Sequence, residues 1–260
     1  MKPHVIAGLD IGTHSIKMMV AKVLKDSGDV EVLGLAEQRS AGVRKGAVVN
    51  PEETTKQILF VKQKIEQMSS FRVKEVSVTL GGSHLFVASS HGIVAVSRAD
   101  ENISQEDVDR VLSAAQAFSI RSNTEILDIV PQQFIVDGAA GVKEPVGMRG
   151  VRLEADVLAI CGFTPYLKNL TGAVLAADLE ITDIVPSPLA AAATVLTPQD
   201  RELGVALVDI GAGTCGLAVY SEGDLIHTAV FPIGSDNITN DIAIGVRCDH
   251  DVAALIKTEF

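Results

Sequence analysis

The stretch from Gly8 to Val20 reads GLDIGTHSIKMMV, and the stretch from Leu207 to Tyr220 reads LVDIGAGTCGLAVY. In both, an apolar run leads into Asp-Ile-Gly, small polar residues follow, and a second apolar run comes next. A strand that ends in this way and doubles straight back forms a tight hairpin. Two such hairpins about 200 residues apart indicate an internal duplication at the scale of a domain.

The segments around each turn repeat as well. The unit consists of a strand, a glycine turn, a strand, an acidic turn, a third strand and a helix, which predicts an α/β fold. In the first unit, Asn50 is expected to cap the helix, with Pro51 in its first turn. In the first unit, strands are expected over 4–11, 15–24, 30–38 and 75–80, with a turn at 25–29 and a loop at 42–49. In the second unit, strands are expected over 203–211, 215–221 and 225–234, and helices over 236–246 and 250–260.

Between the two units the pattern changes. Residues 84–162 are rich in predicted strands and hold one main helix over 104–118, where Ser104 and Asp107 suggest a capping box. Residues 139–150 are expected to form a loop. The following segments predict a helix over 164–177, a strand over 179–185, a buried helix over 187–196, and a polar linker over 197–202 that would be the best domain boundary.

Composition limits the possible functions. The 260 residues are 47% hydrophobic and carry a net charge of -11, which argues against non-specific binding to nucleic acid. Three widely spaced cysteines imply neither a disulfide framework nor a zinc site and fit a reducing cytoplasm. The N-terminus does not resemble a signal peptide, and no segment approaches the apolar length of a membrane span.

The two glycine turns are the candidate binding site. Glycine permits tight backbone there, and free amides together with hydroxyl groups form a cradle for an oxyanion. Lysine adds positive charge, and aspartates suit Mg²⁺ bound through water. The predicted phosphate-binding residues are Gly12, Thr13, Ser15, Lys17, Gly211, Gly213 and Thr214, and the predicted metal-facing residues are Asp10 and Asp209. Two such turns facing each other could hold a triphosphate from both sides.

Other sites are weaker candidates. The run GAGTCG from Gly211 to Gly216 satisfies the dinucleotide-binding pattern, but that pattern needs a helix directly afterwards, and the next residues alternate like a strand. A Walker-type phosphate loop is absent. Possible metal ligands are His84, His91, Asp249, His250 and Asp251, but ordinary polar side chains in loops or strands are the simpler interpretation. Cys215 is a possible nucleophile, but a small buried thiol is the simpler interpretation.

The paired turns resemble the phosphate motifs of the actin, sugar-kinase and Hsp70 superfamily, and the chain most resembles its FtsA family of bacterial cell-division proteins. PQQFIVDG (131–138) and PVGMRGVRLE (145–154) are more specific to that family than the turns. The resemblance implies an actin-like, ribonuclease-H-like duplicated fold with an inserted FtsA-type 1C subdomain of the SHS2 kind. It implies subdomain 1A over 1–83 and 163–197, subdomain 1C over 84–162, and an incomplete subdomain 2A over 198–260, so that the second lobe would be truncated.

The resemblance also implies a function. The family binds ATP with Mg²⁺ between its lobes, self-associates through subdomain 1C, and links the tubulin-like FtsZ ring and other division proteins to the inner face of the membrane at the division septum. Membrane attachment would need a C-terminal part that this sequence lacks. Ala212, Gly216 and Ser187 depart from motifs of the superfamily, which implies weak nucleotide binding and at most slow ATP hydrolysis. A pilus-assembly ATPase, a scaffold that binds nucleotide poorly, and a small-molecule kinase remain alternatives.

The second lobe is expected to be structurally incomplete. Residues 198–260 supply three apolar strands and about one helix, whereas a lobe of this kind needs five strands with helices on both faces. We therefore expect one face and an edge of its sheet to stay uncovered.

Overall fold

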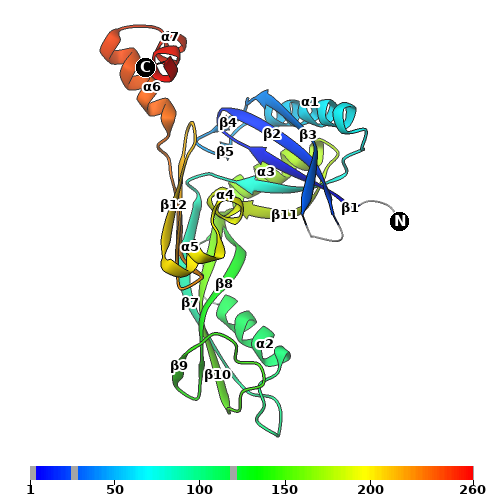
Figure 1. Ribbon diagram of the computed structural model, residues 1–260, viewed down its shortest axis with the longest axis vertical. Coiled ribbons are helices and arrows are strands. Elements are labelled where there is room, and N and C mark those ends of the chain that lie inside the picture. Colours follow the sequence, from blue (N-terminus) through cyan, green and yellow to red (C-terminus); the bar gives the residue numbers. More distant parts are fainter. Residues whose placement is uncertain (1–3, 25–28, 118–121, 260) are drawn as a thin grey trace.

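The computed structural model describes residues 4–24, 29–117 and 122–259, and Figure 1 shows their arrangement. Most of the expected turn at 25–29 lies outside these residues. The first sheet has the order β11-β6-β1-β2-β3, in which β1 to β3 form an antiparallel meander while β6 and β11 run parallel to β1. Its strands are β1 (His4–Ile11), β2 (Ser15–Val23), β3 (Val30–Arg39), β6 (Glu75–Leu80) and β11 (Glu180–Pro186).

Helices α1 (Pro51–Ser69) and α3 (Thr164–Ala176) cover one face of this sheet. Asn50 caps α1 by accepting a hydrogen bond from the Glu53 amide, as the sequence predicts. The core between the helices and the sheet includes fully buried Leu9, Met18 and Ile58. The opposite face carries partly exposed apolar side chains on the same strands, Ile6, Met19 and Leu35.

A short ribbon replaces the expected loop at 42–49. Strands β4 (Val43–Arg44) and β5 (Ala47–Val48) pair across Lys45 and Gly46, which have φ values of 49° and 69°. Two consecutive residues with positive φ are the mark of a tight two-residue hairpin. The loop prediction is therefore wrong for these residues, and the ribbon brings Gly46 next to the first turn, where its amide donates to the Thr13 hydroxyl oxygen at 2.9 Å.

The inserted subdomain is a separate sheet with the order β7-β10-β8-β9, covered by α2. The capping box of Ser104 and Asp107 forms as predicted at the start of α2. The start of the expected loop at 139–150 is instead the short strand β9, which pairs with β8. The elements are β7 (Leu85–Ala95), α2 (Gln105–Gln116), β8 (Thr124–Val136), β9 (Ala139–Val142) and β10 (Arg152–Phe163).

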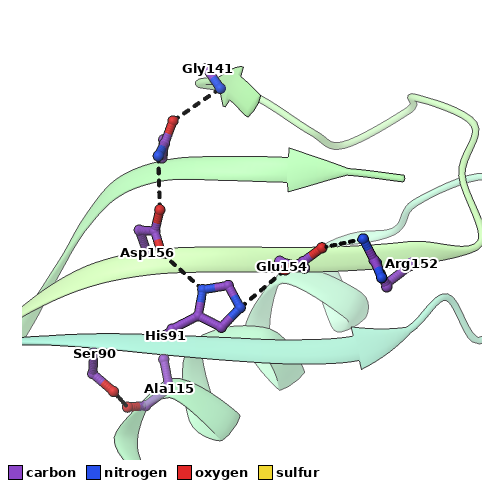
Figure 2. A network of polar contacts seen from close by, with 8 residues as sticks. Ser90, His91, Ala115, Gly141, Arg152, Glu154 and Asp156 are labelled. Atoms are coloured by element: carbon purple, nitrogen blue, oxygen red, sulfur yellow. Dashed lines mark hydrogen bonds and ion pairs between the residues drawn. The ribbon is translucent and has the colours of Figure 1, made fainter. Parts of the chain in front are cut away.

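A polar network crosses this sheet, as Figure 2 shows. His91 on β7 contacts Asp156 through Nδ1 at 2.8 Å and Glu154 through Nε2 at 3.0 Å. Asp156 also accepts a hydrogen bond from Gln133, and Arg152 pairs with Glu154. The network links neighbouring strands through side chains on their exposed face.

The third sheet has the order β12-β13-β14 and follows two helices. Helix α4 was predicted to be buried, but only Pro188 and Ala192 are, and Val195 is 68% exposed. The expected polar linker at 197–202 forms the short helix α5, which Thr197 and Asp200 cap. The elements are α4 (Ser187–Val195), α5 (Pro198–Leu203), β12 (Val205–Ile210), β13 (Cys215–Ser221) and β14 (Asp224–Phe231).

This sheet packs against α4 and against the inserted subdomain. Leu158 and Ile160 of β10 share a buried cluster with Ala218, Tyr220 and Leu225 of β13 and β14. Gln132 of β8 donates to the Leu225 carbonyl, and Lys143 pairs with Asp224. The inserted subdomain is thus seated on the second lobe.

The final helices, α6 (Ser235–Val246) and α7 (His250–Glu259), pack on each other and extend away from the first sheet (Figure 1). Comparison of the two duplicated strands shows that α6 and α7 do not cover the third sheet as α1 and α3 cover the first. Leu9 and Ile11 of β1 are 1% and 5% exposed, whereas the matching Val208 and Ile210 of β12 are 56% and 66% exposed. No helix within the described residues combines the length and apolarity that crossing a bilayer requires.

Candidate functional site

The two glycine turns lie on one cavity of about 280 Å³. They have the same geometry, because the Gly12 amide donates to the Ser15 carbonyl at 3.1 Å and the Gly211 amide donates to the Thr214 carbonyl at 2.9 Å. Eight of the nine predicted site residues line the cavity: Asp10, Gly12, Thr13, Ser15, Lys17, Asp209, Gly211 and Thr214.

Gly213 is the predicted residue that does not line the cavity. A Cβ atom built on it would lie 2.8 Å from the Thr13 side chain, so Gly213 is where the second turn touches the first. No larger residue fits there unless Thr13 moves. Gly213 therefore lets the two turns approach each other closely, and phosphate binding by its backbone amide stays a prediction.

Gly216 has a similar part on β13. A Cβ atom on it would lie 2.6 Å from the Pro188 ring at the start of α4. The superfamily motif has a carboxylate at this position, and in this chain Pro188 fills the space that its side chain would need. The glycine that replaces this acid therefore allows a close contact between the second lobe and α4.

Four backbone amides at the turns are available to a ligand. Those of Thr13, His14, Ala212 and Gly213 have no hydrogen-bond partner within the described chain. The Thr13 hydroxyl oxygen accepts from the Gly46 amide, which leaves its proton free to be donated to an anion. Consecutive free amides in a turn form a concave site suited to an anion.

Charged groups surround these amides. Lys17 pairs with Asp10 in the register of β1 and β2, and both line the cavity. Ser187 and Pro188 place the N-terminal end of α4 at the same cavity, and the N-terminus of a helix favours negative charge. The site can accommodate a polyanion. Because Asp10 and Asp209 would repel a bare anion, they would contact it only through a bound metal ion.

Two further glycines at the cavity were missed by sequence reasoning. Gly46 and Gly81 both line it, and a Cβ on Gly46 would lie 2.1 Å from the Gly81 carbonyl oxygen. The signal for Gly81 was the Gly-Gly pair that closes strand 75–80. Gly46 had no comparable signal, because its ribbon is two residues long on each side.

A second cavity of about 570 Å³ adjoins the first. It shares Thr13, His14 and the residues from Ile210 to Ala212 with the first cavity, and α6 and α7 form its other side. Its polar lining comes from both lobes and includes Arg39, His14, Asp236, His250, Asp251 and Lys257. The residues of the two turns thus lie between the first cavity and a second one that reaches α7.

The alternative sites find little support. GAGTCG leads into strand β13, so the helix that a dinucleotide fingerprint needs is absent. In the described ranges, no three His, Cys, Asp or Glu side chains gather to hold a metal ion. Burial lowers the pKa of His84 to about 4, and its ring lies 5.0 Å from that of Tyr166. A metal at Asp10 and Asp209 would therefore need oxygen atoms from the ligand or from water.

Comparison with known proteins identifies the family. The family model described as "SHS2 domain inserted in FTSA" matches residues 82–161, and "Cell division protein FtsA" matches residues 206–260. Cell division protein FtsA of Pseudomonas aeruginosa is 41% identical over 98% of this chain and 60% of its own length. The Bacillus subtilis protein of the same name is 39% identical over 96% of this chain and 57% of its own.

Solved structures show the fold. The PilM-PilN type IV pilus biogenesis complex matches with a TM-score of 0.70 and 17% identity over 98% of this chain and 69% of that one. EutJ, an ethanolamine utilization protein from Carboxydothermus hydrogenoformans, matches with a TM-score of 0.58 and 16% identity over all of this chain and 63% of its own. The fold is actin-like with an inserted SHS2 subdomain, and the chain spans about 60% of the curated relatives it matches. The sequence relatives and both family models agree, and this chain belongs to the FtsA family of cell division proteins.

Proposed function

We propose that this chain binds the phosphates of ATP, with Mg²⁺, in the cavity between its two glycine turns. The observation that carries the proposal is that one cavity is lined by residues of both turns, among them Thr13, His14 and Ala212, whose backbone amides have no partner within the described chain. The close-packed glycines of the turns let backbone approach the ligand, and the two aspartates suit a hydrated Mg²⁺. The residues therefore fit this ligand.

Each group would have a distinct part. The amides of Thr13 and His14 would bind phosphate oxygens from one side, and those of Ala212 and Gly213 from the other, with the Lys17 ammonium group adding charge. Asp10 and Asp209 would hold the water shell of Mg²⁺, which supplies charge neutralisation of the phosphates when bound. The adjoining cavity, with Asp236 and Lys257, has room for the nucleoside.

The chain would act in cell division through this site and through its inserted subdomain. We infer, from family membership, that it associates with other division proteins and with copies of itself, the latter through the inserted subdomain. Links to FtsZ and to the inner face of the membrane at the septum belong to the same inference. The full-length relatives are longer, so these roles would involve more of the protein than this chain contains.

Hydrolysis is expected to be slow. The acidic side chains that line the cavity are Asp10 and Asp209, and Ser187 occupies the start of α4, where a general base could have stood. A serine hydroxyl is a far weaker base than a carboxylate at neutral pH. A scaffold with little nucleotide binding is the second candidate function, favoured by the exposed apolar residues Val208 and Ile210 of the second lobe.

Calorimetric titration with Mg-ATP tests the proposal. The unsubstituted chain should bind with a dissociation constant above about 1 µM, and Lys17→Ala should weaken binding about tenfold. Lys22→Ala is the matched control, because Lys22 lies on the same strand and makes only an exposed ion pair with Glu31. Equal effects of the two variants would argue against the site, and no binding at millimolar ATP would favour the scaffold.

A further inference from the structure

The carboxylate of Asp10 is held by a residue outside the cavity. The Thr79 hydroxyl on β6 donates a hydrogen bond of 2.5 Å to Asp10 Oδ1. The contact follows from the sheet, because β1 and β6 are parallel neighbours with Leu9 opposite Val78, which sets Asp10 beside Thr79. Thr79 does not line the phosphate cavity; it lines a neighbouring pocket together with Asp10 and Lys17, and the hydrogen bond to Asp10 is what links it to the site.

This hydrogen bond leaves one carboxylate oxygen free. Oδ2 lies on the side of the first turn, 3.7 Å from the position that a Cβ on Gly12 would take. A carboxylate whose Oδ1 is fixed in this way cannot rotate freely about its χ2 angle, which is otherwise a soft torsion. The free oxygen is thus aimed at the turn before any ligand arrives.

The equivalent aspartate of the second turn has no such support. No hydrogen bond or ion pair reaches the Asp209 carboxylate within the described residues. The reason is the sheet, because β12 has β13 on one side and, in the part of the chain that the structure describes, no strand in the place that β6 holds beside β1. The two aspartates, which match in sequence, therefore differ in how firmly they are held.

We propose that Thr79 is a positioning residue that fixes the Asp10 carboxylate for Mg²⁺ and so sets how strongly the metal assists nucleotide binding. The inference rests on the proposed function. Ordering a ligand-binding side chain in advance removes part of the entropy that binding would otherwise cost. Groups that support a metal ligand commonly affect metal affinity by tenfold or more. The amides of the turns and Lys17 bind phosphate directly, so Thr79 should not affect nucleotide binding in the absence of metal.

The test compares ATP binding in excess Mg²⁺ with ATP binding in EDTA for the whole chain and three variants. Thr79→Val keeps the shape and removes the hydroxyl, and Thr79→Ser keeps the hydroxyl. Ser77→Ala is the matched control, since Ser77 lies on the same strand and face and contacts Thr182 instead of the site. Thermal melting of each variant checks that the fold is retained.

Thr79→Val should raise the dissociation constant for Mg-ATP about tenfold and leave that for metal-free ATP within about twofold. Thr79→Ser should restore Mg-ATP binding to within about threefold, and Ser77→Ala should change neither constant. An equal loss with and without Mg²⁺ would show a structural role, and no loss would show no role; either overturns the inference. Absence of ATP binding by the unsubstituted chain would contradict the proposed function itself, and the inference with it.

Discussion

At the scale of single residues, the turns depend on glycines that leave no room for a side chain. A Cβ on Gly213 would meet Thr13, and a Cβ on Gly216 would meet Pro188, each at less than 3 Å. Both contacts join the second lobe to the first part of the chain. They explain why the second turn is specified by close packing as well as by its amides.

Replacing Gly216 should separate these parts. Gly216→Ala would force the β13 backbone away from Pro188, and such overpacking typically costs about 1–3 kcal/mol. Gly172→Ala on α3 is the control, because nothing lies within 4 Å of its Cβ position and alanine is the better helix former. Denaturant midpoints measure both. A midpoint for Gly216→Ala at or above that of Gly172→Ala would contradict the packing argument.

His91 gives the inserted subdomain a dependence on pH. Its two ring nitrogens both face carboxylates, and both can donate a hydrogen bond only when the imidazole is protonated. The hydrogen bond with Asp156 raises the pKa of His91, with a smaller contribution from Glu154. This contribution to stability is complete below the unfolded value near 6.5 and is lost as pH rises through the folded value.

The subdomain should therefore melt at a lower temperature as pH rises from about 6 to about 8. Asp156→Asn should flatten this slope, because it removes the partner that most raises the pKa of His91. The lowered pKa of Asp156 acts in the opposite direction only at acid pH, outside this window. Thermal melts at constant ionic strength test the prediction, and an unchanged slope in Asp156→Asn would refute it.

Much of the candidate site could be predicted from the sequence, because each of its two glycine turns is formed by residues that are close together in the chain. Each turn lies within one short stretch, so its glycines, hydroxyls and aspartate could be read directly. Gly46 and Thr79 could not, because β4 and β6 bring them to the site through pairing that no periodicity encodes. The same limit explains the missed ribbon and β9, which are too short to show an alternating pattern.

At the scale of elements, the second lobe is the least covered part of the chain. Strand β12 pairs on one side only and exposes Val208 and Ile210, whereas β6 lies between β1 and β11. An edge strand with exposed apolar side chains opens more easily than a buried central strand. The sequence predicted this outcome, since only three strands follow residue 198.

Hydrogen exchange on the purified monomer should show the difference. Backbone amides from Val205 to Val208 should exchange at least about tenfold faster than those from Val76 to Thr79. The comparison needs a check by light scattering that no oligomer is present. Equal protection in a monomer would show that the second lobe is stable by itself and would contradict the expectation.

At the scale of the whole molecule, one sheet connects the candidate site to the inserted subdomain. The turn between β12 and β13 lines the phosphate cavity, and Ala218 of β13 and Leu225 of β14 share a buried cluster with Leu158 and Ile160 of β10. A structural change in the second lobe would thus be transmitted to the inserted subdomain, the part of this chain that the SHS2 model matches. This cluster, which we call the seat of the inserted subdomain, is apolar and buried, so a charged side chain introduced into it should destabilise the contact.

Ala218→Asp should loosen this seat, because an unpaired carboxylate in a buried apolar cluster is strongly disfavoured. We expect a larger radius of gyration by small-angle X-ray scattering and faster proteolysis between the subdomain and the second lobe. Ala206→Asp on the neighbouring strand β12 is the control, since Ala206 is exposed and lies outside the cluster. Identical scattering of the chain and Ala218→Asp would show that the seat does not hold the subdomain.

The central claim is that both turns bind one ligand, and amide NMR shifts during a titration with Mg-ATP test it most directly. The free amides of Thr13 and His14 and those of Ala212 and Gly213 should shift together, with one common dissociation constant. Shifts at one turn alone, two different dissociation constants, or no shift at millimolar Mg-ATP would contradict a shared phosphate site.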